Sequence, residues 1–133
     1  MPNDPKISAP RTVLVVDDDE AFRRSLRLLL ELDGFTVTTA ENGVRGLQAF
    51  RNRNPDVVLV DIMMPKLGGI ETIRQMRRER PGAKVIAMSG GARADGLDFA
   101  TAARELGAVA ALEKPFDPAV LSSLLRDLMP HTA

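Results

Sequence analysis

Acidic, hydroxyl and amine side chains follow four apolar stretches of this chain, at the point where each stretch ends. Asp17 and Asp18 come after the first stretch, Asp61 after the second, and Ser89 and Lys114 after the remaining two. Short apolar runs rich in β-branched residues are typical of strands buried on both faces of a parallel sheet. Because all strands of such a sheet end at the same edge, we expect these side chains to lie in one crevice.

This set of side chains suits the transfer of a phosphoryl group. The carboxylates of Asp17, Asp18 and Asp61 would repel one another unless a cation neutralised them. Magnesium suits a few carboxylates together with waters and a phosphate oxygen. Lys114 adds a compact positive charge for one phosphoryl oxygen, and the Ser89 hydroxyl can donate a hydrogen bond to another. Asp61 is then expected to be the nucleophile that accepts the group.

Short apolar runs, and apolar residues at helical spacing, predict the elements that must position these residues. We expect strands over residues 12–16, 35–39, 57–61, 84–88 and 108–112. Helices are expected between them and after the last, with Asp19, Asn42 and Asp117 as N-caps and Gly34 and Gly107 as ends. Gly68-Gly69 opens the third helix, and the fourth covers about residues 95–106. Five strands alternating with five helices through short connections predict an α/β fold with one doubly wound parallel sheet.

Helical spacing of apolar residues predicts which helix faces pack inward. The expected inward positions are Phe22, Leu26, Leu29 and Leu30; Val44, Leu47 and Phe50; Ile70, Ile73 and Met76; Leu97, Phe99, Ala103 and Leu106; and Leu121, Leu124, Leu125 and Leu128. Arg23, Arg24 and Arg27 lie off the apolar face of the first helix and are interpreted chiefly as exposed charge.

Composition limits the classes of function. The 133 residues carry 18 basic and 18 acidic side chains, so no overall field favours nucleic acid or an anionic membrane. Cysteine is absent, which excludes thiolate metal sites, and no apolar run approaches the roughly 20 residues of a membrane span. We expect a cytoplasmic protein with a flexible leader over 1–10, one domain over 11–129 and a stub over 130–133. His131, in that stub, is not expected to act in a site.

Four motifs in order give the chain a strong resemblance to a known family. VLVVDDDEAFR, PDVVLVDIMMP, AMSGG and EKPF each lie at a predicted strand end. Together they resemble the receiver domain of bacterial two-component response regulators, over about residues 11–129. The resemblance implies a flavodoxin-like strand order 2-1-3-4-5 with five helices. It also implies a cis peptide bond between Lys114 and Pro115.

The resemblance further implies a function and a ligand set. Asp61 would accept a phosphoryl group from a histidine kinase, a histidine phosphotransfer protein or a small phosphodonor, with Ser89 and Lys114 assisting. Magnesium, which manganese can replace, would be bound directly by Asp18, Asp61 and the backbone carbonyl of Met63, and through water by Asp17. Such a domain catalyses its own phosphorylation and dephosphorylation and is not an enzyme that turns over an external substrate.

Two departures from the family pattern bear on switching and lifetime. Family members usually carry an aromatic residue or histidine where this chain has Ala111, so we expect backbone and helix movement near Ser89-Gly90-Gly91 to replace a rotating ring. Met63 and Gly91 occupy the positions that tune dephosphorylation, and neither can orient an attacking water. A relatively long-lived phosphoaspartate is therefore expected.

The output and the alternatives also follow from the residues present. No DNA-binding segment is evident, so we expect a stand-alone receiver that acts by protein contact on an unknown target, without direct DNA or membrane binding, as a monomer or phosphorylation-dependent dimer. The main alternative is a degenerate receiver that binds partners without phosphorylation. An aspartyl-phosphate enzyme usually has a second aspartate where Met63 stands, and a flavin module usually has aromatic residues, whereas this chain lacks Trp and Tyr. Both of these rivals are weak.

Overall fold

The computed structural model describes residues 11–64, 68–90 and 99–129, which form a doubly wound α/β fold. Within these residues five parallel strands form one sheet in the order β2-β1-β3-β4-β5, as predicted. The strands are β1 (Thr12–Val16), β2 (Thr36–Ala40), β3 (Val57–Asp61), β4 (Val85–Gly90) and β5 (Ala110–Lys114). The helices are α2 (Glu20–Leu32), α3 (Gly43–Arg53), α4 (Gly69–Glu79), α5 (Phe99–Glu105) and α6 (Pro118–Leu128).

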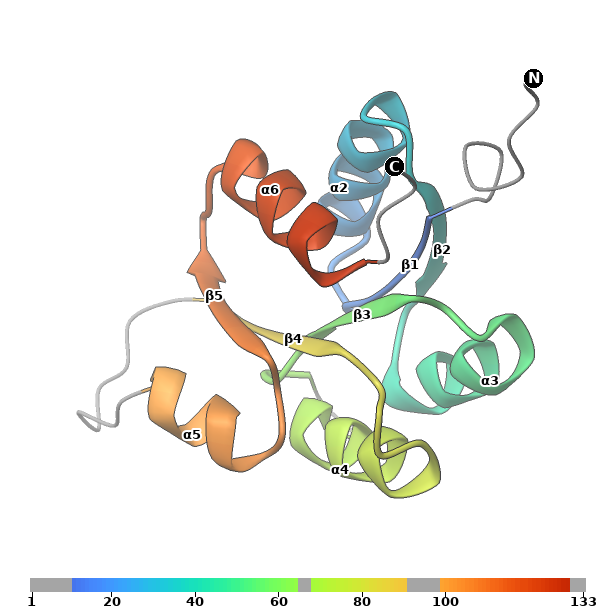
Figure 1. The fold of residues 1–133 in the computed structure, drawn as a ribbon, viewed down its shortest axis with the longest axis vertical. Helices are drawn as coiled ribbons and strands as arrows, with labels where there is room; N and C mark the ends of the chain where they lie inside the picture. The colour runs from blue at the N-terminus through green and yellow to red at the C-terminus, as the bar shows by residue number, and fades with distance from the viewer. Residues whose placement is uncertain (1–10, 65–67, 91–98, 130–133) are drawn as a thin grey trace.

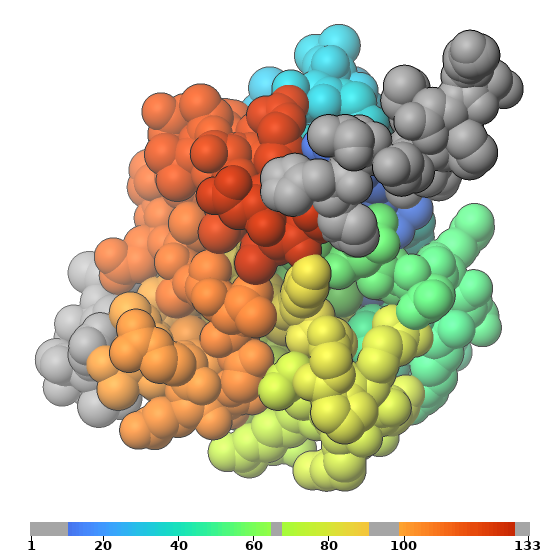
Figure 2. Space-filling view, in the orientation of Figure 1, coloured from blue at the N-terminus to red at the C-terminus, as the bar shows by residue number. Residues whose placement is uncertain are grey.

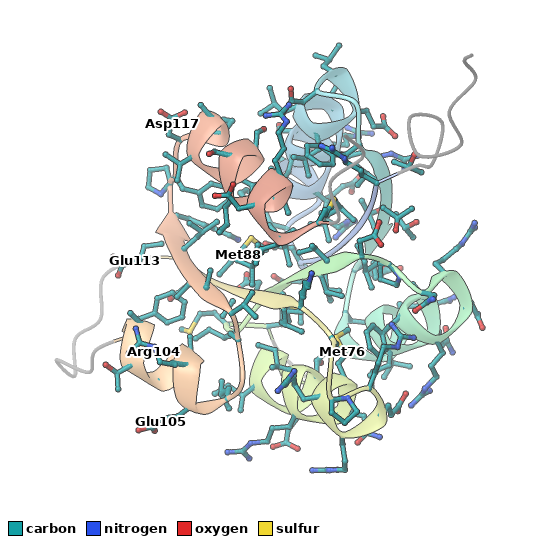
Figure 3. All side chains as sticks on the ribbon, in the orientation of Figure 1. Met76, Met88, Arg104, Glu105, Glu113 and Asp117 are labelled. Atoms are coloured by element: carbon teal, nitrogen blue, oxygen red, sulfur yellow. The ribbon has the colours of Figure 1, made fainter. Side chains whose placement is uncertain are left out.

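The sheet is a middle layer between two groups of helices. In Figure 1, α2 and α6 cover one face of the sheet, and α3, α4 and α5 cover the other. The strands send alternate side chains to two apolar clusters, with Val13 of β1 on the α2–α6 side and Leu14 on the α3–α4 side. Met88 and Met76, labelled in Figure 3, belong one to each cluster. Burial on both faces explains why the strands read as continuous apolar runs.

The predicted helix caps are confirmed. The side chains of Asp19, Asn42 and Asp117 each accept a hydrogen bond from a backbone amide in the first turn of α2, α3 and α6. Gly34 and Gly107, placed just beyond α2 and α5, have φ of 96°, the left-handed conformation that glycine adopts without strain. Local side-chain chemistry therefore fixes where these helices begin and end.

Several predicted inward positions are wrong. Val44 is 55% exposed, Ile70 41% and Leu29 43%. Leu47 and Phe50 in α3, and Ile73 and Met76 in α4, are buried as predicted. The buried stripes also include Gly43 and Gly46 in α3 and Gly69 and Thr72 in α4, which were not predicted. In α3, a Cβ on Gly46 would lie 2.9 Å from Cγ2 of Val16, so the helix backbone lies directly against β1. Glycine on the inward face rotates the helix away from the stripe that apolar residues alone would define.

The predicted bounds of the last two strands are displaced. We expected strands over 84–88 and 108–112, whereas β4 continues to Gly90 and β5 to Lys114. Ser89 pairs with Glu113, and Gly90 with Lys114, so the predicted Ser89 and Lys114 side chains belong to strands and do not follow them. The helix expected over 95–106 is described from Phe99 to Glu105, and the start of that prediction, with Leu97, lies outside the described residues.

The space-filling view shows how closely the second half of the chain packs. In Figure 2 the red α6 lies directly above the orange region of α5 and β5. Arg104, Glu105, Glu113 and Asp117 lie around the edge of this region in Figure 3. None of the helices in the described part of the chain has the length and apolar character needed to span a membrane. The predicted leader over 1–10 and the predicted stub over 130–133 lie outside the residues that the structure describes. Residues 65–67, between β3 and α4, also lie outside them.

Candidate functional site

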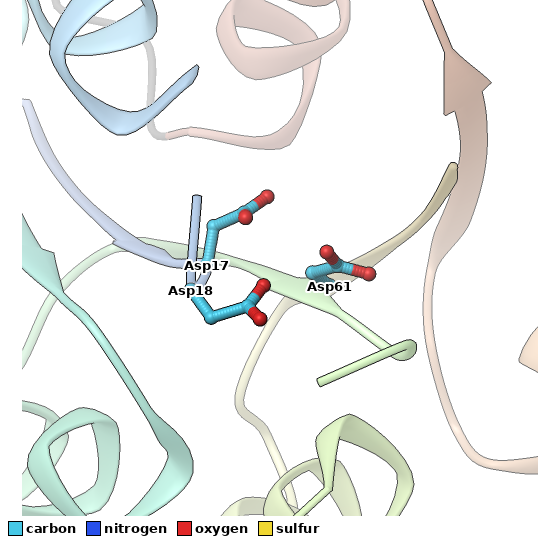
Figure 4. Close-up of side chains that lie close together, drawn as sticks. All are labelled: Asp17, Asp18 and Asp61. Carbon is cyan, nitrogen blue, oxygen red and sulfur yellow. The ribbon is translucent and has the colours of Figure 1, made fainter. Parts of the chain in front are cut away.

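Three carboxylates meet where β1 and β3 end. Asp17 and Asp18 follow β1, and Asp61 is the last residue of β3. The two strands are neighbours, with Val16 paired to Val60. One carboxylate oxygen from each aspartate lies within 4.8 Å of the others, and Figure 4 shows the three side chains in the same crevice. Asp17 and Asp61 are buried, whereas Asp18 is exposed.

Backbone amides hold two of these carboxylates in place. Oδ1 of Asp17 accepts a hydrogen bond from the amide of Asp19 at 2.9 Å, and Oδ1 of Asp61 accepts one from the amide of Met63 at 2.8 Å. In addition, Nη1 of Arg23 donates to the backbone carbonyl of Asp17 at 2.7 Å. One oxygen of each buried carboxylate is thus tied to the loop that follows its strand, which leaves the other oxygen for a cation.

Lys114 supplies that cation from the end of β5. Its Nζ lies 2.5 Å from Oδ2 of Asp17 and 3.2 Å from Oδ2 of Asp61. The lysine side chain is only 17% exposed. The two bonds join residues 97 and 53 positions apart in the sequence, so they connect β5 to β1 and β3 across the crevice. The charge of Lys114 compensates only part of the negative charge of the three carboxylates.

The pKa values of both members of this ion pair are raised, but for different reasons. Burial raises the pKa of the Asp17 carboxyl, and hydrogen bonds from Lys114 and from the Asp19 amide offset this only in part. For Lys114, burial lowers the pKa of the amine, but the hydrogen bond to Asp17 and the charges of Asp17 and Asp61 outweigh it, so the pKa is raised overall. The amine is therefore firmly protonated at neutral pH.

Ser89 brings a buried hydroxyl to the same edge. Asp61 pairs with Met88 across β3 and β4, so Ser89 lies one residue further along the neighbouring strand. The serine is 1% exposed, and its Oγ has no hydrogen-bond partner among the residues that the structure describes. Buried hydroxyl groups in proteins are nearly always hydrogen bonded. An oxygen-rich ligand at this edge would give the hydroxyl an acceptor.

Gly69 is part of the framework of the site, although the sequence predicts it only as the opening of a helix. A Cβ on this residue would lie 2.1 Å from the carbonyl oxygen of Asp61 and 2.4 Å from Cα of Ile62. The first turn of α4 therefore lies directly against the backbone that carries Asp61. The only signal in the sequence is the glycine pair shortly after Asp61, which does not by itself reveal a close approach.

The remaining predicted residues are only partly described. The Met63 side chain is 62% exposed, whereas Met64 is buried. The Lys114–Pro115 peptide bond is cis, as predicted. The Asp19 side chain accepts a hydrogen bond from the Phe22 amide, which confirms its role as a cap. Gly91 lies outside the described residues.

The donor set fits a hard divalent cation. Three carboxylates converge, two of them buried, and the cluster carries a net negative charge even with Lys114 beside it. Carboxylate oxygens are the ligands that magnesium prefers in proteins. Asp17, Asp18 and Asp61 are the described side chains that could hold the ion.

The sheet order and the acidic crevice at the carboxyl edge define a doubly wound α/β domain with its polar site where such sheets bind ligands. Residues 13–126 match the family described as the response regulator receiver domain. The chain therefore belongs to the receiver family of two-component response regulators. Receiver domains bind Mg²⁺ at an acidic pocket and are not enzymes that turn over an external substrate.

Solved structures of receivers share this fold. A receiver domain protein from Clostridium thermocellum is 34% identical, with a TM-score of 0.79 over 88% of this chain and 92% of that one. A CheY-like receiver domain protein from Methanospirillum hungatei is 30% identical, with a TM-score of 0.79 over 90% of this chain and 94% of that one.

The similar curated proteins are longer. The transcriptional regulatory protein CseB of Streptomyces avermitilis is 43% identical over 117 residues, which is 88% of this chain but 48% of that protein. The response regulator MprA of Mycobacterium sp. strain KMS is 38% identical over 93% of this chain and 53% of that protein. A homologue of the transcriptional regulatory protein CpxR in Haemophilus influenzae is 40% identical over 91% and 51%. The chain spans about half the length of these relatives.

These relatives correct one of our expectations. From the sequence we expected a stand-alone protein without direct DNA binding, and this expectation is wrong. Proteins that match nearly the whole chain are named transcriptional regulatory proteins, and each has about as many residues again outside the match. The expectation rested on this chain's residues alone, whereas about half of each relative lies outside the match.

Proposed function

We propose that this receiver accepts a phosphoryl group on Asp61 from a phosphohistidine of a histidine kinase or of a phosphotransfer protein. One Asp61 carboxylate oxygen attacks phosphorus while the bond between phosphorus and the donor nitrogen breaks. The imidazole leaves with the electron pair of that bond and takes up a proton, and Asp61 becomes an acyl phosphate. With acetyl phosphate as donor, acetate is the leaving group. We also propose that the receiver domain extends from residue 11 to residue 129.

The observation that carries the proposal is the position of Asp61 among groups that neutralise or bind phosphoryl oxygens. Lys114 lies 3.2 Å from Oδ2 of Asp61, and Ser89 holds a buried hydroxyl without a partner among the described residues. Both side chains can contact oxygens of a group placed on Asp61. Electrostatic positioning of this kind is the main protein contribution to phosphoryl transfer.

Magnesium, or manganese in its place, would be held by Asp18, Asp61 and the Met63 carbonyl, with Asp17 acting through water. When bound, the ion supplies positive charge that offsets the charge of the transferring group. The chain's own residues do the rest: the Asp19 and Met63 amides orient the buried carboxylates, and Lys114 presents its ammonium to the reacting oxygen.

Intact mass after incubation with acetyl phosphate and Mg²⁺ tests this proposal. We expect one phosphoryl adduct on the wild type and none on Asp61→Asn or in metal-free samples. Asp33→Asn is the matched control, because Asp33 pairs with Arg126 on the surface between α2 and α6 and should leave the adduct intact. Absence of the adduct from the wild type would support the alternative, a degenerate receiver that binds partners without phosphorylation.

Two further features of the proposed cycle follow from residues near Asp61. The Met63 side chain is apolar and 62% exposed, so it offers no group to orient an attacking water. We propose a phosphoaspartate that outlasts seconds in Mg²⁺, and a several-fold faster decay in Met63→Gln. Loss of label from the wild type within seconds would contradict this.

The switch would also differ from one based on a rotating ring. Ala111 is half-buried and packs against the cluster that contains Phe99. We propose that phosphorylation moves the backbone between Gly90 and Leu112 instead. Amide NMR spectra of the phosphorylated and free protein should show shifts in this segment, and unchanged spectra there would contradict the proposal.

The output is proposed to be the control of transcription. The names of CseB and of the CpxR homologue support this, since both are transcriptional regulatory proteins. A strain carrying Asp61→Asn should differ from wild type in its transcript profile when the signalling system is active. Identical profiles would contradict a phosphorylation-dependent transcriptional output.

A further inference from the structure

Besides the two carboxylates, the Lys114 ammonium contacts an aromatic ring. Its Nζ lies over the ring of Phe22, 4.0 Å from the ring centroid. A cation within about 6 Å of an aromatic face is attracted by the electron-rich centre of the ring. The ammonium thus lies between Asp17, Asp61 and the Phe22 face.

The Phe22 ring is itself held in position. Its amide donates to the Asp19 side chain at 3.2 Å, which fixes the residue in the first turn of α2. Its ring packs nearly perpendicular to that of Phe116, with centroids 6.0 Å apart and an interplanar angle of 84°. Phe116 lies two residues after Lys114, so the segment that carries the amine also carries the ring that packs against Phe22. The contact therefore joins the start of α2 to the end of β5.

The ring differs from the carboxylates in how it responds to a metal. A hard cation takes oxygen ligands, so it would compete with Lys114 for Asp17 and Asp61. An aromatic ring offers no oxygen, and its attraction for the ammonium stays when the carboxylates are neutralised. Lysine has a long flexible stem, and without such a contact the ammonium would have less to keep it at the site.

We propose that Phe22 is a positioning residue that holds the Lys114 ammonium beside Asp61 when the neighbouring carboxylates are neutralised. The lysine is then ready for an oxygen of the incoming phosphoryl group. This inference rests on the proposed phosphorylation of Asp61, and it gives Phe22, which lies within the VLVVDDDEAFR motif, a role that the resemblance to receivers does not assign.

The first test is spectroscopic and does not depend on activity. In protein with ¹³C-labelled lysine, the ε-protons of Lys114, assigned by their loss in Lys114→Arg, should be shifted upfield by the ring, both without and with saturating Mg²⁺. The shift should persist in Phe22→Tyr, which keeps the aromatic face, and disappear in Phe22→Leu, which keeps only apolar bulk. An unshifted Lys114 signal in the Mg²⁺-loaded wild type would overturn the proposal without the need for any variant.

The second test is the rate of phosphorylation by acetyl phosphate at saturating Mg²⁺. Loss of a cation–π contact should lower the rate constant of Phe22→Leu about three- to tenfold, and Phe22→Tyr should retain the wild-type rate. Phe35→Leu is the packing control, since Phe35 lies in the same apolar cluster but has Arg126 and not Lys114 near its ring, at 5.8 Å. Its rate should be unchanged.

The outcomes separate this inference from the function on which it rests. If Phe22→Leu takes up a phosphoryl group as fast as the wild type, the positioning role is overturned and the function of Asp61 stands. A wild type that takes up none overturns both. Equal losses of rate in Phe22→Leu and Phe35→Leu would assign the effect to general packing and would likewise overturn the positioning role.

Discussion

At the scale of single residues, Gly69 shows how one missing methyl group can position a site. The backbone of α4 approaches the Asp61 carbonyl so closely that Gly69→Ala must displace either the helix or the strand end. We expect a loss of about 1–3 kcal/mol in the free energy of unfolding, measured with urea, despite the higher helix propensity of alanine. The rate of Asp61 phosphorylation should fall with it, because the loop that holds the Asp61 carboxylate moves.

Gly82 provides the matched control for this substitution. It lies in the turn after α4, and a Cβ there would meet nothing within 4 Å. Gly82→Ala should therefore be neutral, or more stable by up to about 1 kcal/mol through the unfolded chain. If the two variants unfolded alike, the close approach of α4 to Asp61 would not exist in solution.

At the scale of elements, an ion pair joins α3 to α4. Nε of Arg51 donates to Oε1 of Glu79 at 2.8 Å, and a second bond links the other guanidinium nitrogen to Oε2. The hydrogen bonds from Arg51, and then Gln75, lower the pKa of Glu79 to about 2. A folded-state pKa below the ordinary value means that the pair stabilises the fold above about pH 4.5 and loses this effect as the pH falls toward 2.

The pH dependence of unfolding checks this reading of the pair. Glu79→Gln should lower the unfolding temperature near pH 7, and its difference from wild type should shrink as the pH falls from about 4.5 to about 2. Glu71→Gln, which breaks an exposed pair with Arg74 inside α4, should have little effect at any of these values. A Glu79→Gln difference that stayed constant over this range would show that the pair has another role.

The elements also show what could be predicted from the sequence. β1 was predicted with its observed bounds because its last four residues, Val13 to Val16, are buried on both faces of the sheet and form a continuous apolar run. The faces of α3 and α4 were predicted only in part, because Gly46, Gly69 and Thr72 carry no apolar signal although they lie inward. Periodicity reports which residues avoid water, and it does not report where a backbone must come close to a sheet.

The sequence predicts which residues form the site, but it does not predict all the contacts that they make. Parallel strands place their carboxyl ends at one edge, so the meeting of Asp17, Asp18, Asp61 and Lys114 follows from topology alone. The contact of Lys114 with Phe22 does not follow, because it depends on the direction in which α2 leaves β1. The transcriptional output that the relatives' names indicate could not be predicted either, since about half of each relative lies outside the match.

At the scale of the whole molecule, the acidic site connects strands that are far apart in sequence. A cation held by Asp18 and Asp61 would bridge the ends of β1 and β3, and it would bind only the folded chain. Such binding stabilises the fold by mass action. At a ligand concentration of a hundred times the dissociation constant, the gain is about 2.7 kcal/mol, or on the order of 10 °C in unfolding temperature for a domain of this size.

We expect Mg²⁺ to raise the unfolding temperature of the wild type by this amount and that of Asp18→Asn by little. Asp19→Asn should keep the full rise, because asparagine caps a helix as well as aspartate and Asp19 serves α2 as its cap. Thermal unfolding with and without Mg²⁺ measures all three proteins, and an undiminished rise in Asp18→Asn would remove this carboxylate from the metal site.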